Sequence, residues 1–146
     1  MTEPAVLTFT ARGRPVAQGS MRSPAIGVLV HDSPRLVSWR RTIGWAAIEA
    51  LQWLGTDGGT RFPLRGAVAV EARFRLPRPK GVPRAKRKYP TVRKDDIDKL
   101  TRALLDALSG IAYSDDGQVC SLLVTRGYDD FGEGPGVDVL VRTWEA

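Results

Sequence analysis

The charged side chains that could do chemistry in this chain change from basic to acidic at residue 95. Residues 72–94 contain ten lysines and arginines and no acidic residue, and six aspartates then follow between positions 95 and 116. Lysine and arginine neutralise and position phosphate groups. Carboxylates hold Mg²⁺ ions, which stabilise the attacking and leaving oxygens when a phosphodiester is cleaved. A basic strip that leads directly into a carboxylate cluster therefore indicates metal-assisted chemistry on a polyanion.

Three of the aspartates are spaced so that they could form one site. Asp96 and Asp98 bracket the start of a predicted helix, and Asp116 lies beyond its end, just before a predicted strand. We expect helix and strand to fold back on each other, so that Asp116 returns to Asp96 and Asp98. Three carboxylates would form a hard oxygen site for Mg²⁺ or Mn²⁺. Arg102 and Asp106 follow Asp98 at intervals of four residues, on one polar stripe of the helix.

Each aspartate also has a purely local interpretation. Asp95 and Asp96 could cap the helix and interact favourably with its dipole. The sequence Asp115-Asp116-Gly117 could form an ordinary turn. The residue pattern alone leaves the metal site and the local interpretations open.

The basic strip runs through a segment that cannot be regular structure. Four prolines between positions 77 and 90 exclude a helix or a central strand, so we predict a surface loop. Its cations have no counter-ions nearby in the sequence, which favours phosphate contact over a solvated linker. The predicted DNA-contacting residues are Arg73, Arg75, Arg78, Lys80, Arg84, Lys86, Arg87, Lys88, Arg93, Lys94 and Lys99.

Composition and length exclude several classes of protein. The 146 residues, 42% of them hydrophobic, are enough to bury a core, and we predict one domain over residues 1–146. The net charge of +6 favours an acidic partner, with nucleic acid ahead of an anionic membrane. The longest apolar segment, residues 36–54, is interrupted by three charged residues and cannot span a bilayer.

The single cysteine, the single histidine and the N-terminal residues exclude further kinds of site. Cys120 and His31 are the only residues of their types, which excludes an internal disulfide and a multi-cysteine zinc site and disfavours a Ser-His-Asp triad. The first residues show no charged leader followed by an apolar run. We therefore expect a cytoplasmic protein.

Apolar periodicity predicts an α/β domain with a mixed sheet and two main helices. Strands are predicted over residues 6–11, 67–76, 119–128 and 137–144, with a short additional strand in a hairpin over residues 25–31. In the 67–76 strand, alternate residues from Val68 to Leu76 should face the core. Glu71, Arg73 and Arg75 should face the other side.

Capping residues delimit the two helices. The first is predicted to begin at Ser33-Pro34 and to end at Gly55. Its tryptophans at positions 39, 45 and 53 are assigned to the core or a dimer face rather than to base stacking. The second helix should begin after Asp95 or Asp96 and end at Gly110. Its predicted buried stripe is Ile97, Leu100, Leu104, Leu108 and Ile111.

Three segments together resemble the RusA family of Holliday junction resolvases. They are the motifs Lys-Asp-Asp-Ile-Asp-Lys-Leu at 94–100, Leu-Asp-Ala-Leu-Ser-Gly at 105–110 and Asp-Asp-Gly-Gln-Val at 115–119. The family comprises small, Mg²⁺-dependent, homodimeric endonucleases, often encoded by phages and prophages. The resemblance implies that Asp96, Asp98 and Asp116 bind metal and act in catalysis. Asp106 and Asp115 also match family positions.

The chain departs from the family pattern at two positions beside these aspartates. Lys99 stands where an asparagine often follows the second aspartate, and Arg102 aligns with a helix lysine that assists catalysis. Arginine can clamp a phosphate with two hydrogen bonds but does not transfer a proton near neutral pH. Lys99, three residues before Arg102, is therefore a second candidate for the missing ammonium group.

The combined prediction is a homodimeric endonuclease that cuts four-way DNA junctions. The strip at 73–94 would bind the junction, and Mg²⁺ or Mn²⁺ would bind Asp96, Asp98 and Asp116. A two-fold dimer would make the two symmetric nicks that recombination and repair require, in the cytoplasm of a bacterial or phage-infected cell. Two alternatives remain: a metal nuclease that prefers flaps or other branched DNA, and a basic DNA-binding protein without catalysis.

Overall fold

The computed structural model describes residues 5–19, 33–54, 61–83, 89–91, 94–130 and 132–145. Its elements are β1 (Val6–Arg12), α1 (Pro34–Trp53), β2 (Val68–Leu76), α3 (Ile97–Leu108), the 3₁₀ helix η1 (Asp116–Gln118), β3 (Val119–Tyr128) and β4 (Gly136–Thr143). The four strands and two helices predicted within these ranges are confirmed. The strand predicted at 25–31 and the helix stop at Gly55 lie outside the described residues.

The sheet is mixed, with the strand order β1-β4-β2-β3. β4 lies between β1 and β2 and is antiparallel to both. β2 and β3 are parallel, and α3 connects them. In such a crossover the helix returns the chain to the end of the sheet where the first strand began. The two ends of α3 therefore lie at opposite ends of the parallel strands.

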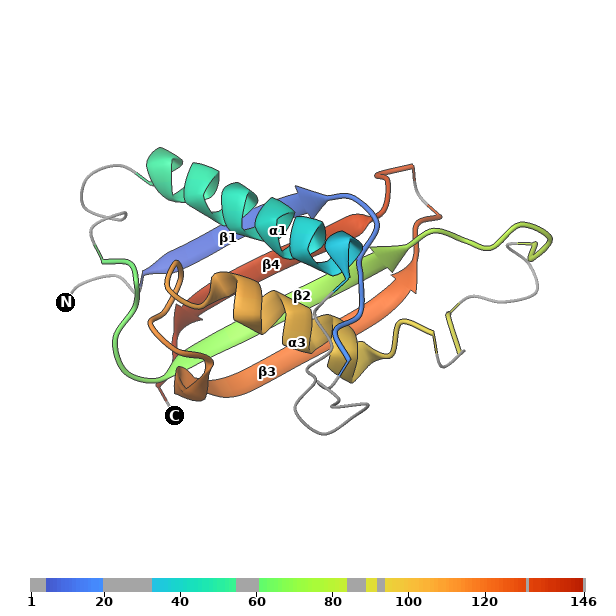
Figure 1. Ribbon diagram of the computed structural model, residues 1–146. Helices are drawn as coiled ribbons and strands as arrows, with labels where there is room; N and C mark the ends of the chain where they lie inside the picture. The colour runs from blue at the N-terminus through green and yellow to red at the C-terminus, as the bar shows by residue number, and fades with distance from the viewer. Residues whose placement is uncertain are drawn as a thin grey trace, which may run out of the picture.

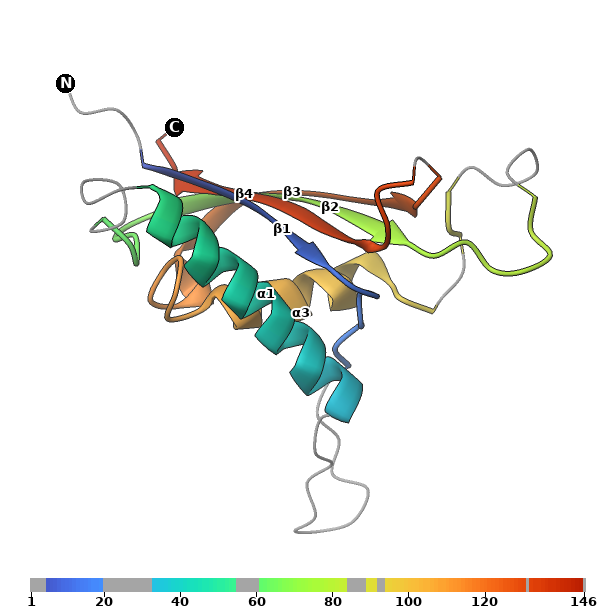
Figure 2. The same ribbon diagram turned by 90° about the horizontal axis from the view of Figure 1, so that it is seen from above.

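Both helices cover the same face of the sheet, and the chain forms a single two-layer α/β domain (Figure 1). Figure 2 shows the sheet on edge, with α1 and α3 both on one side of it. No helix of the described residues is long and apolar enough to cross a membrane.

The core forms where the helices meet the sheet. Ser33 caps α1, its Oγ accepting a hydrogen bond from the Leu36 N–H at 3.2 Å, and Pro34 follows at the first helical position. Leu100, Leu104 and Leu108 of α3 are fully buried, as their spacing predicts. The core-facing side chains of β2 are also buried, as predicted: Val68, Val70, Ala72, Phe74 and Leu76.

The structure separates buried from exposed residues among the apolar positions of α1 and α3. The prediction that Ile97 is buried is wrong, since this first residue of α3 is 39% exposed. Trp45 and Trp53 are 65% and 84% exposed, so only Trp39 of the three α1 tryptophans belongs to the core. Ile111 packs against the core while remaining partly accessible.

Arg75 is the exception on β2. Alternation placed it on the exposed side with Glu71 and Arg73, yet it is 5% exposed. The loop between β3 and β4 covers it, and the Gly134 carbonyl accepts a hydrogen bond from its Nε at 2.9 Å. Strand periodicity specifies the face of a residue, and a loop distant in sequence decides whether that face is solvated.

Candidate active site

The start of α3 presents two carboxylates. Asp96 occupies the N-cap position, as predicted, but its side chain makes no capping hydrogen bond. Asp98 lies in the first turn and is exposed. Lys99 approaches this pair, with its Nζ 4.0 Å from Oδ2 of Asp96, the outer limit of an ion pair. The Asp96 carboxylate is therefore not used to cap the helix, and the Asp98 carboxylate is exposed to solvent.

Arg126 of β3 holds the turn that leads into these carboxylates. Asp95 has a φ of 60°, in the left-handed region that non-glycine residues seldom adopt. Its carbonyl accepts a hydrogen bond from Nη1 of Arg126 at 2.6 Å, and the Lys94 carbonyl lies at 3.4 Å from the same atom. Sequence analysis missed Arg126, because a single arginine on a strand carries no local sign of a role elsewhere.

At the far end of α3, Asp115 builds the turn that η1 begins. Its Oδ2 accepts a hydrogen bond from the Gly117 N–H at 3.0 Å. Oε1 of Gln118 accepts a bond from the Asp115 N–H, also at 3.0 Å, which completes a capping box. The local interpretation is therefore correct for Asp115. Asp116, the next residue, is exposed.

The predicted return of Asp116 to Asp96 and Asp98 is wrong within one chain. The helix between them has 12 residues, a length of about 18 Å. Figure 1 shows its two ends at opposite ends of the sheet. In the described part of the chain, no three Asp, Glu, His or Cys side chains form a group that could hold a metal ion. One chain by itself thus does not supply the expected three-carboxylate site.

Comparison with known families decides the class of protein. A family model described as Endodeoxyribonuclease RusA matches residues 12–142. The chain belongs to the RusA family. A relative from Bacillus subtilis (strain 168), described as uncharacterized protein YqaN, is 29% identical over 147 residues, which cover 93% of this chain and 95% of the relative. Membership indicates an endodeoxyribonuclease that resolves Holliday junctions, and RusA-family nucleases are generally metal-dependent.

Part of the basic strip of this RusA-family chain is neutralised by its own fold. Arg73 and Arg75 both pair with Asp138 of β4 and with Glu133 of the β3–β4 loop. Arg78 pairs with Asp130 at 2.7 Å. The prediction that the strip lacks counter-ions is therefore wrong for these three arginines, because the sheet and the loop after β3 bring acids distant in sequence beside them.

The pKa shifts describe this arginine–carboxylate cluster. Burial acts to raise the pKa of Asp138, but hydrogen bonds from Arg75, Thr10 and Arg73 together outweigh it and hold the pKa below its ordinary value. The hydrogen bond to Asp130 raises the pKa of Arg78, whose guanidinium also stacks over the Tyr128 ring at 4.4 Å. These contacts indicate a structural role for Arg73, Arg75 and Arg78.

The remaining predicted DNA contacts fall into two groups. Lys80, Lys94 and Lys99 lie within the structure, and Lys80 and Lys94 are exposed. The others, which form the densest part of the strip, lie outside the described residues: Arg84, Lys86, Arg87, Lys88 and Arg93.

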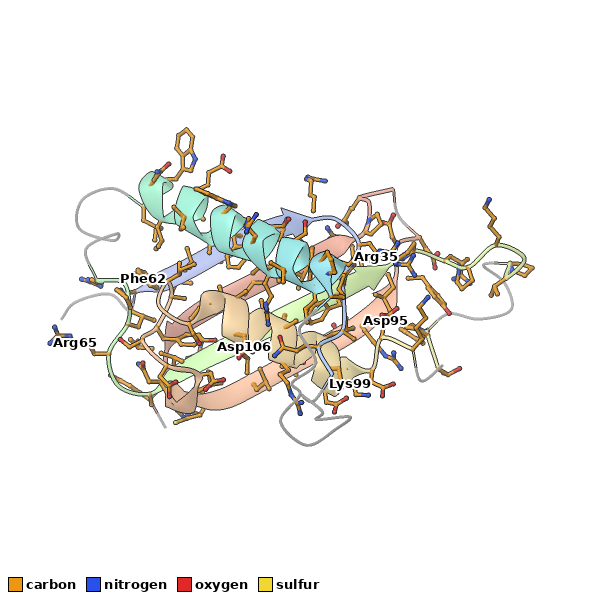
Figure 3. The ribbon with its side chains drawn as sticks, in the orientation of Figure 1. Arg35, Phe62, Arg65, Asp95, Lys99 and Asp106 are labelled. Atoms are coloured by element: carbon orange, nitrogen blue, oxygen red, sulfur yellow. The ribbon has the colours of Figure 1, made fainter. Side chains whose placement is uncertain are left out.

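The polar stripe of α3 contains Arg102 and Asp106, and Asp106 contacts the segment after β1. Arg102 is exposed, whereas Asp106 accepts a hydrogen bond from Nε2 of Gln18 at 2.5 Å. Oε1 of Gln18 in turn accepts one from Nη1 of Arg40 on α1 at 2.9 Å. Figure 3 shows Asp106 along α3, away from Asp95 and Lys99 at the helix start. Asp106 therefore ties α3 to α1, a role that helical spacing alone could not reveal.

The acidic end of α3 also acts on Tyr113. Burial, and then the charges of Asp116, Asp106 and Asp115, raise the pKa of this phenol well above its ordinary value. Its hydroxyl donates a hydrogen bond to the Leu105 carbonyl at 2.7 Å. Tyr113 therefore stays protonated and fixes the C-terminal end of α3.

Proposed function

We propose that this RusA-family chain is a Mg²⁺-dependent endodeoxyribonuclease, active also with Mn²⁺, that resolves four-way junctions by paired symmetric nicks in recombination and repair. The observation that supports this most strongly is the start of α3. The Asp96 side chain does not cap the helix, and Asp98 is exposed. Both follow the exposed Lys94 and the carboxyl end of β2 along the chain. Sites in α/β proteins commonly form at the carboxyl ends of parallel strands.

The separation of the aspartates supports a homodimer in which each site is shared. Asp96 and Asp98 lie at one end of α3, and Asp116 lies beyond the other. We propose that a two-fold axis brings Asp116 of the partner subunit to Asp96 and Asp98. A two-fold relation that forms one such site necessarily forms a second, identical one. This arrangement matches a reaction that needs two equivalent cuts.

The chain's own residues have distinct proposed roles. Asp96, Asp98 and Asp116 would hold the metal, whose chemistry when bound is to stabilise charge on the phosphate oxygens. Arg102, exposed one turn beyond Asp98, would donate hydrogen bonds to a non-bridging phosphate oxygen. Lys80, Lys94, Lys99 and the basic residues at 84–88 and 93 would position the DNA arms. Arg126 is a positioning residue, since it holds the Asp95 turn.

Cleavage of synthetic DNA tests this proposal. A four-way junction, a flap and a linear duplex of equal length are incubated with the protein in Mg²⁺ or in EDTA. We expect symmetric nicks in the junction with Mg²⁺ and none in EDTA. Faster cleavage of the flap would indicate a nuclease for other branched DNA. Junction binding without cleavage of any substrate would indicate the non-catalytic DNA-binding protein.

A further inference from the structure

β3 forms one edge of the sheet, and within the described residues it pairs with β2 alone. Its outer side therefore presents a row of backbone N–H and C=O groups that no strand of the sheet uses. The strand has ten residues, Val119–Tyr128, and none of them is lysine, proline or an acid. Soluble proteins use those residue types to protect an edge strand from further pairing. β3 thus has the features of a strand that accepts another strand.

The middle of β3 carries two exposed leucines. Leu122 and Leu123 are 47% and 61% exposed, and successive residues of a strand point to opposite faces of the sheet. Both faces of this edge are therefore apolar at the same point. β1, the other edge strand, differs, because its exposed residues are Thr8, Thr10 and Arg12. The apolar edge of the sheet is the β3 edge.

The two halves of the proposed metal site lie at the two ends of β3. Asp116 begins η1, which leads directly into Val119 at the start of the strand. Near the other end of the strand, Nη1 of Arg126 donates a hydrogen bond to the Asp95 carbonyl at 2.6 Å, and Asp96 is the next residue. One strand therefore connects the position of Asp116 with the position of Asp96.

This placement restricts where a two-fold axis can pass. An axis that brings Asp116 of one copy to Asp96 of the other must cross the midpoint between these two residues. Because the residues flank the two ends of both α3 and β3, that midpoint lies near the middle of these elements. Figure 1 shows α3 toward the β3 edge and α1 toward the β1 edge. The β3 edge is therefore the edge of the sheet nearest to the required axis.

Antiparallel pairing of β3 with its own copy satisfies this restriction. A two-fold axis perpendicular to the sheet reverses the strand and leaves the helices of both subunits on the same face. Opposed residues of such a pair share a face, so one residue lies directly opposite its own copy. With Leu122 or Leu123 at that position, Val119 lies within one residue of Arg126 of the partner subunit. The start of β3 in each subunit then meets the Asp95 turn of the other.

We propose that two copies of this chain associate through β3, with the two-fold axis at Leu122 or Leu123 and the two four-stranded sheets joined into one. The inference rests on the proposed function and names the surface that completes its shared site. A second copy is the partner because an isologous interface requires a self-complementary surface. The antiparallel edge supplies one, with leucines on both faces at the axis.

The exposed tryptophans of α1 mark a second apolar surface with a different consequence. Trp45 and Ile48 line a hollow of about 500 Å³ between α1 and α3. An axis at Trp45 would be centred on α1, toward the β1 side of the sheet (Figure 1), and not on the line from Asp96 to Asp116. Dimerisation through this surface is therefore the competing result that an experiment must distinguish.

Disulfide trapping locates the axis. Single cysteines replace Leu122 or Leu123 in a Cys120→Ser background, and the oxidised proteins are compared on a non-reducing gel. Each residue away from the axis separates the two copies by about 7 Å more along the strand, and a disulfide needs Cα atoms within about 7 Å. We expect a linked dimer from one of these two variants. Wild-type Cys120, Thr8→Cys and Trp45→Cys are the controls and should stay unlinked.

Opposite charges near the axis give a second, independent test. Leu123→Lys and Leu123→Glu each remove an apolar contact and bring two like charges together, so each should raise the Kd of the dimer at least about 10-fold. Mixing the two variants should restore dimers and nicking, because opposite charges then face each other. Trp45→Lys is the matched control and should leave the Kd unchanged. Sedimentation measures the Kd, and circular dichroism checks the fold of each variant.

Each other outcome overturns a defined part of the account. A dimer trapped at Thr8 or Trp45, or one that Leu123→Lys and Leu123→Glu leave unchanged, overturns the β3 interface even if junctions are cut. A protein that nicks junctions as a monomer overturns the interface and the shared site but not the nuclease. A dimer trapped through β3 that cleaves no branched DNA supports the interface and overturns the proposed nuclease function.

Discussion

Two regions of this molecule bring acidic and basic side chains together, and only one of them satisfies its charges internally. Along β2 and β4, Arg73 and Arg75 pair with Asp138, and Arg75 is almost completely buried. At the start of α3, the Asp96 side chain makes no capping hydrogen bond, Asp98 is exposed, and the Asp96–Lys99 contact is 4.0 Å long. The first region is built for stability, and the second is left open for a partner.

The difference shows why counting charges along the sequence misleads. Arg73, Arg75 and Arg78 stand in an uninterrupted basic run, yet their counter-ions lie more than 50 residues later. Asp96 and Asp98 stand beside lysines in the sequence and still keep accessible carboxylates. The functional signal is the balance of charged partners after folding. A substitution in either region should therefore be followed by both stability and nicking.

The largest effect is expected at the open carboxylates. Asp98→Asn removes a charge proposed to hold the metal at nearly constant shape, so junction nicking should fall by at least about 10²–10³-fold. Junction binding in EDTA should be retained. Asp115→Asn is the matched control, since that aspartate caps η1. It should nick normally and keep its stability within about 0.5 kcal/mol, because asparagine caps a helix about as well as aspartate does. Equal nicking by Asp98→Asn and wild type would remove Asp98 from the site.

Arg102 comes next in expected size. It is exposed on α3, one turn beyond Asp98, so Arg102→Ala should slow single-turnover nicking by about 10²–10³-fold if it stabilises charge on the phosphate. Arg102→Lys should restore much of the rate. If its role is only an ion pair along the helix, Arg102→Ala should lose stability of about 0.2–0.5 kcal/mol per pair and cut normally.

Substitutions among the ion pairs of β2 and β4 should lower the free energy of unfolding and leave the nicking rate unchanged. Arg75→Ala removes one partner of a nearly buried ion pair and should lower the free energy of unfolding by about 3 kcal/mol. Asp138 keeps its hydrogen bonds from Arg73 and Thr10, so the loss of stability should be at the low end of the range for a broken buried ion pair. Urea denaturation measures the change, with Lys80→Ala as an exposed control for stability. Nicking by the folded Arg75→Ala protein should match wild type, and a nicking defect would return Arg75 to the DNA surface.

A smaller, pH-dependent effect is expected at Asp138. Its pKa is lowered in the folded protein, so its contribution to stability is present above its unfolded pKa of about 4 and is lost as the pH falls through the lower folded value. Asp138→Asn should therefore cost about 1–2 kcal/mol at pH 7. Exposure of a third of the side chain limits that cost. The difference from wild type should shrink below about pH 4, and a difference independent of pH would contradict this assignment.

Local patterns predicted most of the elements and few of their relations. The Ser33-Pro34 cap, the alternation along β2 and the leucine stripe of α3 each depend on neighbours in the sequence, and all three appear as predicted. The insertion of β4 between β1 and β2 depends on pairing between strands far apart in the chain. No local pattern encodes that choice.

The same limit explains the error at the candidate site. The family resemblance predicted Asp96, Asp98 and Asp116 as site residues, and their residue types suggested metal binding. Their convergence depended on the direction of β3, which runs parallel to β2 and so begins at the far end of α3. Had the parallel pairing been recognised, the crossover would have placed Asp116 away from Asp96. The tertiary partners of Arg75 and Arg126 were hidden for the same reason.

Complementation between two inactive variants tests the shared site most directly. One variant carries Asp96→Asn and Asp98→Asn, the other carries Asp116→Asn, and the two are mixed, unfolded and refolded together. If each site combines Asp96 and Asp98 of one subunit with Asp116 of the other, a mixed dimer retains one intact site. Random pairing should then restore about a quarter of the wild-type nicking sites. The products should be single nicks without paired resolution of the junction. Absence of any nicking in a mixture shown to contain mixed dimers, with wild type active under the same conditions, would contradict the shared site.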